Sequence, residues 1–334
     1  MLIQFAVNNY RSIRKCQTLS LVACENLELF QDTHLFPIGS EGKQLLKSAA
    51  IYGANGSGKT NLLNALKTLQ DVVLNSASQV EGEFDVQSCF FGPPDFPTEL
   101  SVVFLENNIR YEYGVSLLKS HVVEEWLIAY SEEESQLIFS RKHRDEPYDD
   151  DWSFPLTPNW GFDEEIKKIK EEVRSNSLCL SHAANSNHPQ LTSAFNWFRH
   201  LYVVMGLNLE GVDKSEEAVR FFDYMLQTKR VVAIDGLGKD LHPLLVKKLV
   251  ELIHDFNPCS TQLIFTTHTT ALMDMDLFRR DQIWFTDKEE QYTTLYSLLE
   301  FKPRESKPPS NSPQGERSLQ QDYLVGRYGA VPFV

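Results

Sequence analysis

The sequence Gly53-Ala54-Asn55-Gly56-Ser57-Gly58-Lys59-Thr60 matches the pattern G-x-x-x-x-G-K-[ST] at each of its fixed positions. This pattern describes the loop that binds the phosphates of a nucleotide. The apolar run Ser48–Tyr52 precedes it and is typical of a buried strand. The segment Asn61–Leu69 follows it and places its leucines on one helical face. A strand before the loop and a helix after it are the required context, so the sequence predicts a nucleoside triphosphate site.

Each residue type in this loop has a chemical reason. Glycines let successive backbone N–H groups turn toward phosphate oxygens with no Cβ in the way. The N-terminus of the following helix adds a partial positive charge. Lys59 is expected to reach the β- and γ-phosphates, and the Thr60 hydroxyl is expected to bind Mg²⁺. The residues expected to contact the nucleotide are Gly53, Asn55, Gly56, Ser57, Gly58, Lys59 and Thr60. A plain glycine-rich turn is the alternative interpretation.

Length and composition fit an α/β protein with a real core. The 334 residues suffice for one large domain or two smaller ones, and 42% of them are hydrophobic. No apolar run approaches the ~20 residues of a membrane span, and the N-terminus lacks the features of a signal peptide. The five cysteines form no C-x-x-C pair and are typical of reduced thiols. We therefore expect a cytoplasmic protein with no membrane contact.

The formal net charge of −14 argues against general attraction to nucleic acid. Direct binding would need a local basic patch or a partner. The one modest basic cluster, residues 141–144, is followed at once by acidic residues and favours a solvated loop. Direct binding of nucleic acid is therefore left open.

Strand and helix patterns suggest where the elements lie. We expect strands at Leu2–Val7 and Thr18–Val22 and a loop over residues 26–47. After the loop helix, the hydrophobic period changes to two and predicts an antiparallel meander. Its four strands are Leu100–Leu105, Ile109–Val115, Val122–Ile128 and Ser135–Ser140. Residues 141–160 are expected to be loop, and a charged helix is expected at Asp163–Val173.

The second half of the chain predicts two more buried strands, Val231–Asp235 and Gln262–His268, with a helix at Leu244–Phe256 between them. This order implies a mostly parallel core sheet. We place one domain at residues 1–300, with an antiparallel β-lobe at about 85–140 and a short helical segment at about 160–230. Residues 301–334 form a C-terminal tail, of which 302–320 are expected to be mobile.

Two residues at strand ends complete the predicted site. An apolar strand that ends in Asp places a carboxylate beside the phosphates, where Asp235 would bind Mg²⁺ together with Thr60. An ordinary strand-capping Asp is the alternative. His268, at the end of the next apolar strand, is expected to face the γ-phosphate, although a lone His at a strand end is more often structural. We take His268 and Asp235 as the candidate catalytic residues.

These segments together resemble the ABC-type core of AAA family ATPases. The residues that carry this resemblance are Gly53–Thr60, Val231–Pro243 and Phe265-Thr266-Thr267-His268. More narrowly, the chain is similar to the RloA/AbiL-type proteins of bacterial antiphage defence, relatives of the OLD-family ATPases. The opening motif Asn9-Tyr10-Arg11-Ser12-Ile13 and the closing segments 278–285 and 323–332 carry this narrower resemblance.

The resemblance implies the fold and the partners. It implies an α/β P-loop NTPase of ABC-ATPase head type, with a mixed central sheet, an antiparallel β-lobe and helices on both faces. Two heads would complete the ATP sites as a homodimer or higher oligomer, with Mg²⁺ as second cofactor. A separate effector, usually a nuclease with a Toprim-type or other centre, would be the partner. Arg11 and Ser12 would contribute near the nucleotide.

The chain departs from the family where hydrolysis is concerned. The family pattern D-E-L-D-x-S-L-H-P reads Asp235-Gly236-Leu237-Gly238-Lys239-Asp240-Leu241-His242-Pro243 here, so Gly236 replaces the glutamate that activates water. Gly238 replaces the aspartate of the loop through which two heads contact each other in the family. The trace of a signature segment, residues 215–218, has Glu217 where glycine is expected. Loss of a positioned base typically costs ~10²–10⁴ in rate, which puts turnover in doubt.

Three hypotheses follow. The first is an ATPase whose ATP-dependent dimerisation and hydrolysis control an effector. The second is a non-hydrolysing ATP-binding module or a decayed copy, favoured by Gly236 and Glu217. The third, a DNA-repair-type head, needs long coiled-coil arms, and the sequence has no sustained heptad stretch. The pair Asp274 and Asp276 has the D-x-D form of a metal site, but a loop beside a helix is the preferred interpretation.

Overall fold

The computed structural model describes residues 1–38, 43–79, 82–90, 92–93, 95–130, 135–143, 151–153, 163–183, 188–206, 216, 219–220, 222–224, 227, 231–239, 241–302 and 318–331. The chain divides into two compact units. Unit 1 contains Met1–Ser20 and Asn64–Val203, and unit 2 contains Leu21–Leu63 and Val204–Val334. Helix α2 (Lys59–Asn75) spans the boundary between them.

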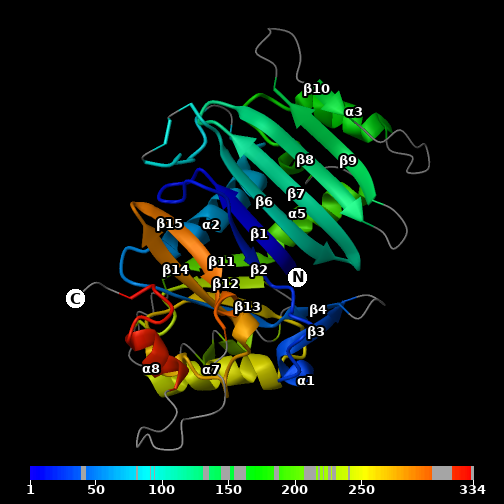
Figure 1. Ribbon diagram of the computed structural model, residues 1–334. Coiled ribbons are helices and arrows are strands. Elements are labelled where there is room, and N and C mark those ends of the chain that lie inside the picture. The colour runs from blue at the N-terminus through cyan, green and yellow to red at the C-terminus, as the bar shows by residue number, and fades with distance from the viewer. Residues whose placement is uncertain are drawn as a thin grey trace, which may run out of the picture. The chain divides into compact units, whose positions relative to one another are not determined.

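Unit 1 is built on a seven-stranded antiparallel sheet of order β10-β9-β8-β7-β6-β1-β2 (Figure 1). The strands are β1 (Leu2–Asn8), β2 (Gln17–Ser20), β6 (Thr98–Glu106), β7 (Ile109–Leu117), β8 (Val122–Tyr130), β9 (Ser135–Lys142) and β10 (Asp151–Ser153). The meander predicted from period-two hydrophobicity is confirmed as β6 to β9. Asn107 and Asn108 form its first tight turn, both with left-handed φ, which asparagine tolerates. The expected loop over 141–160 is wrong at Asp151–Ser153, which pairs with β9 as an edge strand.

Aromatic side chains form the core of unit 1. Helix α5 (Pro189–His200) places Trp197 and Phe198 against Phe104 of β6, with ring centroids 4.3 and 6.0 Å away. Gln70 of α2 donates hydrogen bonds to the carbonyls of Phe198 and Leu201, where α5 ends. The remaining helices are α3 (Asp163–Glu172) and the short α4 (Cys179–His182). The predicted charged helix is thus confirmed.

Unit 2 contains a mixed sheet of order β11-β12-β13-β5-β14-β15, whose first strand spans the boundary of the units. Its strands are β5 (Ser48–Tyr52), β11 (Leu201–Met205), β12 (Val231–Asp235), β13 (Gln262–Thr266), β14 (Ile283–Glu289) and β15 (Tyr292–Ser297). Strands β12, β13, β5 and β14 run parallel, whereas β15 is antiparallel to β14. With the phosphate loop after the central strand β5, this is the predicted α/β fold of a P-loop NTPase.

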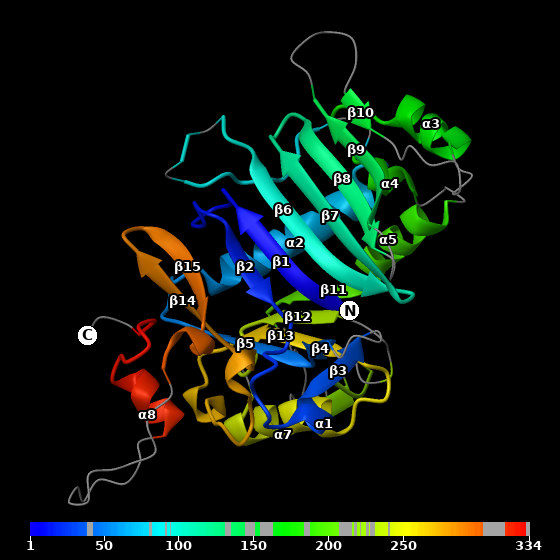
Figure 2. The ribbon, with the colours of Figure 1, turned by 45° about the vertical axis from the view of Figure 1, so that its right-hand side comes forward.

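Helix α7 (Pro243–Asp255) covers one face of this sheet, and Figure 2 shows it (yellow) along β12 and β13. His242 caps its N-terminus and Pro243 occupies the first turn, where a missing N–H costs nothing. The fully buried side chains of Val246, Leu249, Val250 and Ile253 pack with those of Ile234 and Phe265. Burial of these apolar side chains is the main stabilising contribution.

Short elements fill the region predicted to be a loop over residues 26–47, so that prediction is wrong. Helix α1 (Gln31–His34) and a two-stranded sheet, β3 (Leu35–Ile38) with β4 (Lys43–Leu46), occupy it. Three 3-10 turns, Thr270–Leu272, Arg280–Gln282 and Leu298–Glu300, complete unit 2 with helix α8 (Leu319–Leu324). The expected mobile stretch falls largely outside the described residues. The helical segment expected at about 160–230 contains α3, α4 and α5, and most of its residues after 206 lie outside the described part of the chain.

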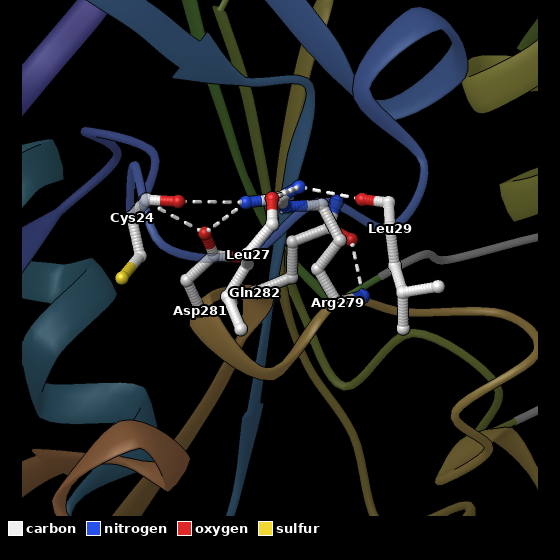
Figure 3. Close-up of polar contacts among 6 residues, drawn as sticks. All are labelled: Cys24, Leu27, Leu29, Arg279, Asp281 and Gln282. Atoms are coloured by element: carbon white, nitrogen blue, oxygen red, sulfur yellow. Dashed lines mark hydrogen bonds and ion pairs between the residues drawn. The ribbon is translucent and has the colours of Figure 1, made fainter.

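A buried ion pair lies within the segment 278–285 that resembles a family motif (Figure 3). Arg279 and Asp281 are each no more than 2% exposed and form a two-pronged bond at 3.0 and 2.8 Å. The other guanidinium N–H groups donate to the carbonyls of Cys24, Leu27 and Leu29. All five donors of Arg279 are therefore satisfied, and Cys24 N–H donates back to Asp281.

In the described part of the chain, every helix is too short or too polar to cross a membrane. The five cysteines carry free thiols.

Candidate nucleotide-binding site

The phosphate loop joins the end of β5 to the start of α2, as the sequence predicts, and it lies within unit 2 up to Leu63. Two of its glycines are required by close approach. A Cβ on Gly58 would overlap the side chain of Thr293, and the φ of +107° also favours glycine. A Cβ on Gly53 would lie 2.6 Å from Ser57 Oγ. Asn55 and Gly56 are exposed at the loop's outer edge.

Two threonines of the β14–β15 hairpin hold the loop by hydrogen bonds to Ser57. The sequence analysis predicted neither. Thr286 Oγ1 shares a hydrogen bond of 2.7 Å with Ser57 Oγ. Thr293 Oγ1 donates to the Ser57 carbonyl at 2.9 Å. All three side chains are buried. No local pattern in these two strands reveals a partner more than 200 residues away.

Lys59 is folded back over its own loop. Its Nζ donates to the carbonyls of Gly53 and Ala54 at 2.7 and 2.9 Å, and the side chain is buried. Burial lowers the pKa of Lys59 to about 8, and the carboxylate of Asp235 opposes this shift. A phosphate anion in the loop would favour the charged lysine again.

Thr60 and Asp235 meet at the end of the sheet, as predicted. Thr60 Oγ1 donates to the Asp235 carboxylate, 2.9 Å from Oδ2 and 3.2 Å from Oδ1. Thr60 is exposed and Asp235 is half-buried, so their oxygens are accessible. A hydroxyl and a carboxylate are the hard oxygen ligands that Mg²⁺ takes alongside phosphate and water. The donor set fits the ion.

Thr266, at the end of β13, orients Asp235 and was not predicted. Its Oγ1 donates to Asp235 Oδ1 at 2.7 Å and accepts from the N–H of Gly236 at 2.7 Å. The hydroxyl thus fixes both the carboxylate and the chain that follows it. No cluster of three or more His, Cys, Asp or Glu side chains that would hold a metal by itself occurs among the described residues.

Gly236 leaves the strand direction directly after Asp235. Its φ is +74°, in the left-handed region, and a Cβ there would meet open space. The next residue, Leu237, donates its N–H to the Thr266 carbonyl at 2.9 Å, and its own carbonyl accepts from Thr267 Oγ1. The chain therefore turns across the end of β13, rather than continuing β12 into the site.

His268 lies two residues beyond the end of β13, not at the strand's last position. Its side chain is exposed, and partial burial of the ring lowers its pKa. The charge of Lys59 lowers that pKa further, while Asp235 raises it. His268 therefore shares the electrostatic environment of the loop, and a role toward the γ-phosphate stays a prediction.

Arg11 and Ser12 belong to unit 1, and their predicted role near the nucleotide stays a prediction. Tyr10 and Ile13 exchange backbone hydrogen bonds around them. The N–H of Arg11 donates to Gln87, and its carbonyl accepts from Phe90, so the motif fastens the segment before β6. Glu217, which stands where the signature segment has glycine, lies outside the described residues, and so does Asp240.

Comparisons with known proteins find similarity to one family model and to solved structures. Residues 48–204 match the family model described as "AAA domain, putative AbiEii toxin, Type IV TA system", just under half of the chain. No curated protein matches. Among solved structures, the SMC head domain from Thermotoga maritima is 11% identical, with a TM-score of 0.34 over 89% of this chain and 98% of that one. An SmcHead bound to the C-winged helix domain of ScpA is also 11% identical, with a TM-score of 0.37 over 89% and 97%.

Proposed function

We propose that this protein is an ATP-binding head of the ABC-type ATPase class. The observation that carries the proposal is the meeting of Thr60 with Asp235 beside a complete phosphate loop. These two residues are 175 positions apart, and the fold places their oxygens within hydrogen-bond distance. The match of residues 48–204 to an AAA domain supports the same class.

The described residues have distinct roles in binding. The backbone N–H groups of Gly53–Gly58 and the Lys59 ammonium bind the phosphates. Thr60 and Asp235 hold Mg²⁺, which supplies positive charge against the phosphate oxygens. Thr266 keeps the Asp235 carboxylate in place through its hydrogen bond. His268 faces the γ-phosphate.

Hydrolysis is the first candidate activity, with ATP-dependent dimerisation of two heads controlling an effector. The second candidate is a module that binds ATP without turning it over. The left-handed turn at Gly236 favours the second candidate, because glycine and not glutamate directly follows Asp235 and the chain turns there. Among the described residues, Asp235 and His268 are the candidates for proton transfer near the loop.

The biological setting is the finer part of the proposal. The opening and closing motifs resemble RloA/AbiL-type proteins, and the description of the matching family model names a putative AbiEii toxin and a Type IV TA system. On this basis we assign the protein to antiphage defence in the cytoplasm, as a homodimer or higher oligomer whose separate effector is a nuclease. A DNA-repair-type head is the third candidate, and the net charge of −14 does not favour it.

The first test measures Mg-ATP binding and phosphate release on one preparation. Lys59→Ala is the loss-of-binding variant, and Lys67→Ala is its matched control, because Lys67 lies on the same helix and forms an ion pair with Asp71. We expect wild type and Lys67→Ala to bind and Lys59→Ala not to bind. Binding with turnover well above Lys59→Ala supports the ATPase. Binding without turnover supports the second candidate, and no binding contradicts the proposal.

A second experiment tests assembly. Molar mass is measured in solution with and without Mg-ATP, for wild type and Lys59→Ala. The proposal expects the mass of wild type to rise with nucleotide and that of the variant to stay unchanged. The same mass under all conditions contradicts ATP-dependent dimerisation and leaves binding to be judged by the first test.

A further inference from the structure

The β14–β15 hairpin has two faces with different neighbours. Side chains of a strand alternate between faces, and paired residues share one. The register pairs Thr286 with Leu295 and Lys288 with Thr293. It pairs Phe285 with Tyr296 and Asp287 with Thr294 on the opposite face. The first face is the one that carries Thr286 and Thr293, the two threonines bonded to Ser57.

The opposite face holds the C-terminal segment, residues 318–331. Asp287 Oδ2 accepts from the N–H of Ala330 at 2.9 Å. Tyr296 Oη donates to the carbonyl of Tyr328 at 2.7 Å. Gly329 lies between these two bonds, and a Cβ on it would come within 2.9 Å of Tyr296 Oη and 3.0 Å of Asp287 Oδ2. The segment is therefore seated closely against the hairpin.

Aromatic packing reinforces this contact. Phe285 stacks on Tyr323 with ring centroids 5.8 Å apart and on Tyr328 at 5.5 Å, and it is fully buried. Tyr323 also lies 6.2 Å from Tyr52, the last residue before the phosphate loop. The C-terminal segment thus contacts both the hairpin that supports the loop and the strand that leads into it.

The segment is held in one conformation by its own bonds. Tyr323 Oη donates to the carbonyl of Ala330 at 2.9 Å. Arg327 pairs with Asp322 at 2.8 Å, and Asp322 is buried. These bonds distinguish the segment from a frayed terminus, which opens at almost no cost in free energy.

We propose that the C-terminal segment positions the phosphate loop through the β14–β15 hairpin. Phe285, Asp287 and Tyr296 are positioning residues on the face that contacts the C-terminal segment. On the other face, Thr286 and Thr293 hold Ser57 of the phosphate loop by hydrogen bonds. The expected effect on nucleotide affinity rests on the function proposed above. The expected effect on the order of the loop does not depend on that function. Release of the segment therefore loosens the loop and weakens Mg-ATP binding.

The experiment measures hydrogen–deuterium exchange of backbone amides 53–60 without nucleotide, together with the Kd for Mg-ATP. Tyr296→Phe removes one hydroxyl and keeps the ring. Tyr130→Phe, in unit 1, is the matched control, since it also removes one tyrosine hydrogen bond, to Glu112. Loss of one such hydrogen bond changes an equilibrium constant by about 3- to 10-fold. We expect exchange in the loop to rise and affinity to fall by this factor in Tyr296→Phe alone.

The outcomes separate the two proposals. If residues 318–331 exchange faster in Tyr296→Phe while residues 53–60 keep the wild-type rate, the inference is overturned. If the loop responds but wild type binds no Mg-ATP, the proposed function fails and the positioning effect stands. If Tyr296→Phe does not fold, Asp287→Asn replaces it. That variant weakens the bond to Ala330 with no change in size, and it is judged by the same exchange rates.

Discussion

At the scale of single residues, the state of Lys59 dominates the chemistry of the site. Its pKa of about 8 means that the free protein loses the lysine charge as pH rises through 8. Phosphate stabilises the charged form, so nucleotide binding takes up a proton above that pH. We expect the affinity for Mg-ATP to fall between pH 7 and pH 9 by up to about tenfold per pH unit. Titration calorimetry in two buffers of different ionisation enthalpy measures both affinity and proton uptake. Equal affinity at both pH values, with no proton uptake, would contradict this assignment.

A second prediction at this scale concerns the missing glutamate. Gly236→Glu restores the residue type of the family, but the left-handed φ of +74° strains any residue with a Cβ, by about 1–2 kcal/mol. A Cβ at this position would contact none of its surroundings. We expect Gly236→Glu to lose stability and to gain no turnover, with Gly236→Ala as the control that carries the strain without the carboxylate. A rise in phosphate release in Gly236→Glu, absent from Gly236→Ala, would show that the turn rearranges and that only the base was missing.

At the scale of elements, two buried histidines connect α1 with α7. The rings of His34 and His254 lie 3.8 Å apart, and His254 Nε2 bonds to Ser48 Oγ. Burial lowers the pKa of both histidines, and the charge of Lys47 lowers both further, while Asp255 raises that of His34. Arg279 also lowers the pKa of His34.

The sign of the pH effect follows from these shifts. Both histidines have a lower pKa in the folded state than the ordinary 6.5, so the unfolded chain binds more protons. The stabilising contribution is present above pH 6.5 and is lost as pH falls below it. We expect the free energy of unfolding to drop between pH 7 and pH 5, by up to about 1.4 kcal/mol per pH unit and per proton. Denaturant titrations at several pH values measure it. A slope that His254→Gln leaves unchanged would place the acid sensitivity elsewhere.

A second prediction at this scale concerns the buried Arg279–Asp281 ion pair, which joins two segments of unit 2 (Figure 3). Asp281→Asn leaves a buried guanidinium without its counter-charge, which costs about 3–5 kcal/mol. The matched control is Glu251→Gln, which removes one charge from an accessible pair with Lys248, a pair worth at most about 1 kcal/mol. Urea denaturation of both variants measures the difference. Equal losses of stability in the two would contradict a structural role for the buried pair.

At the scale of the whole molecule, the sequence predicts the parts that depend on local pattern. The phosphate loop, the meander and the strand that ends in Asp235 each have a short motif or a clear hydrophobic period. The elements in residues 26–47 were missed because each is four residues long, too short for a period to appear. Thr266, Thr286 and Thr293 were missed because their partners are distant in sequence. The described part of the predicted tail, residues 318–331, packs on Phe285 and Tyr52, which no local pattern indicates.

The position of β5 in its sheet has a consequence for biosynthesis. Strand β5 is translated early, yet its hydrogen-bonded neighbours are β13 and β14, which begin at Gln262 and Ile283. A nascent chain therefore carries its phosphate loop on an unpaired apolar strand while more than 200 further residues are added. Unit 1 has no such delay after Val203, because all strands of its sheet are translated by then. During synthesis the chain thus exposes an unpaired, aggregation-prone strand edge of the kind that chaperones protect. We expect it to gain affinity for nucleotide only after β13 and β14 have left the ribosome.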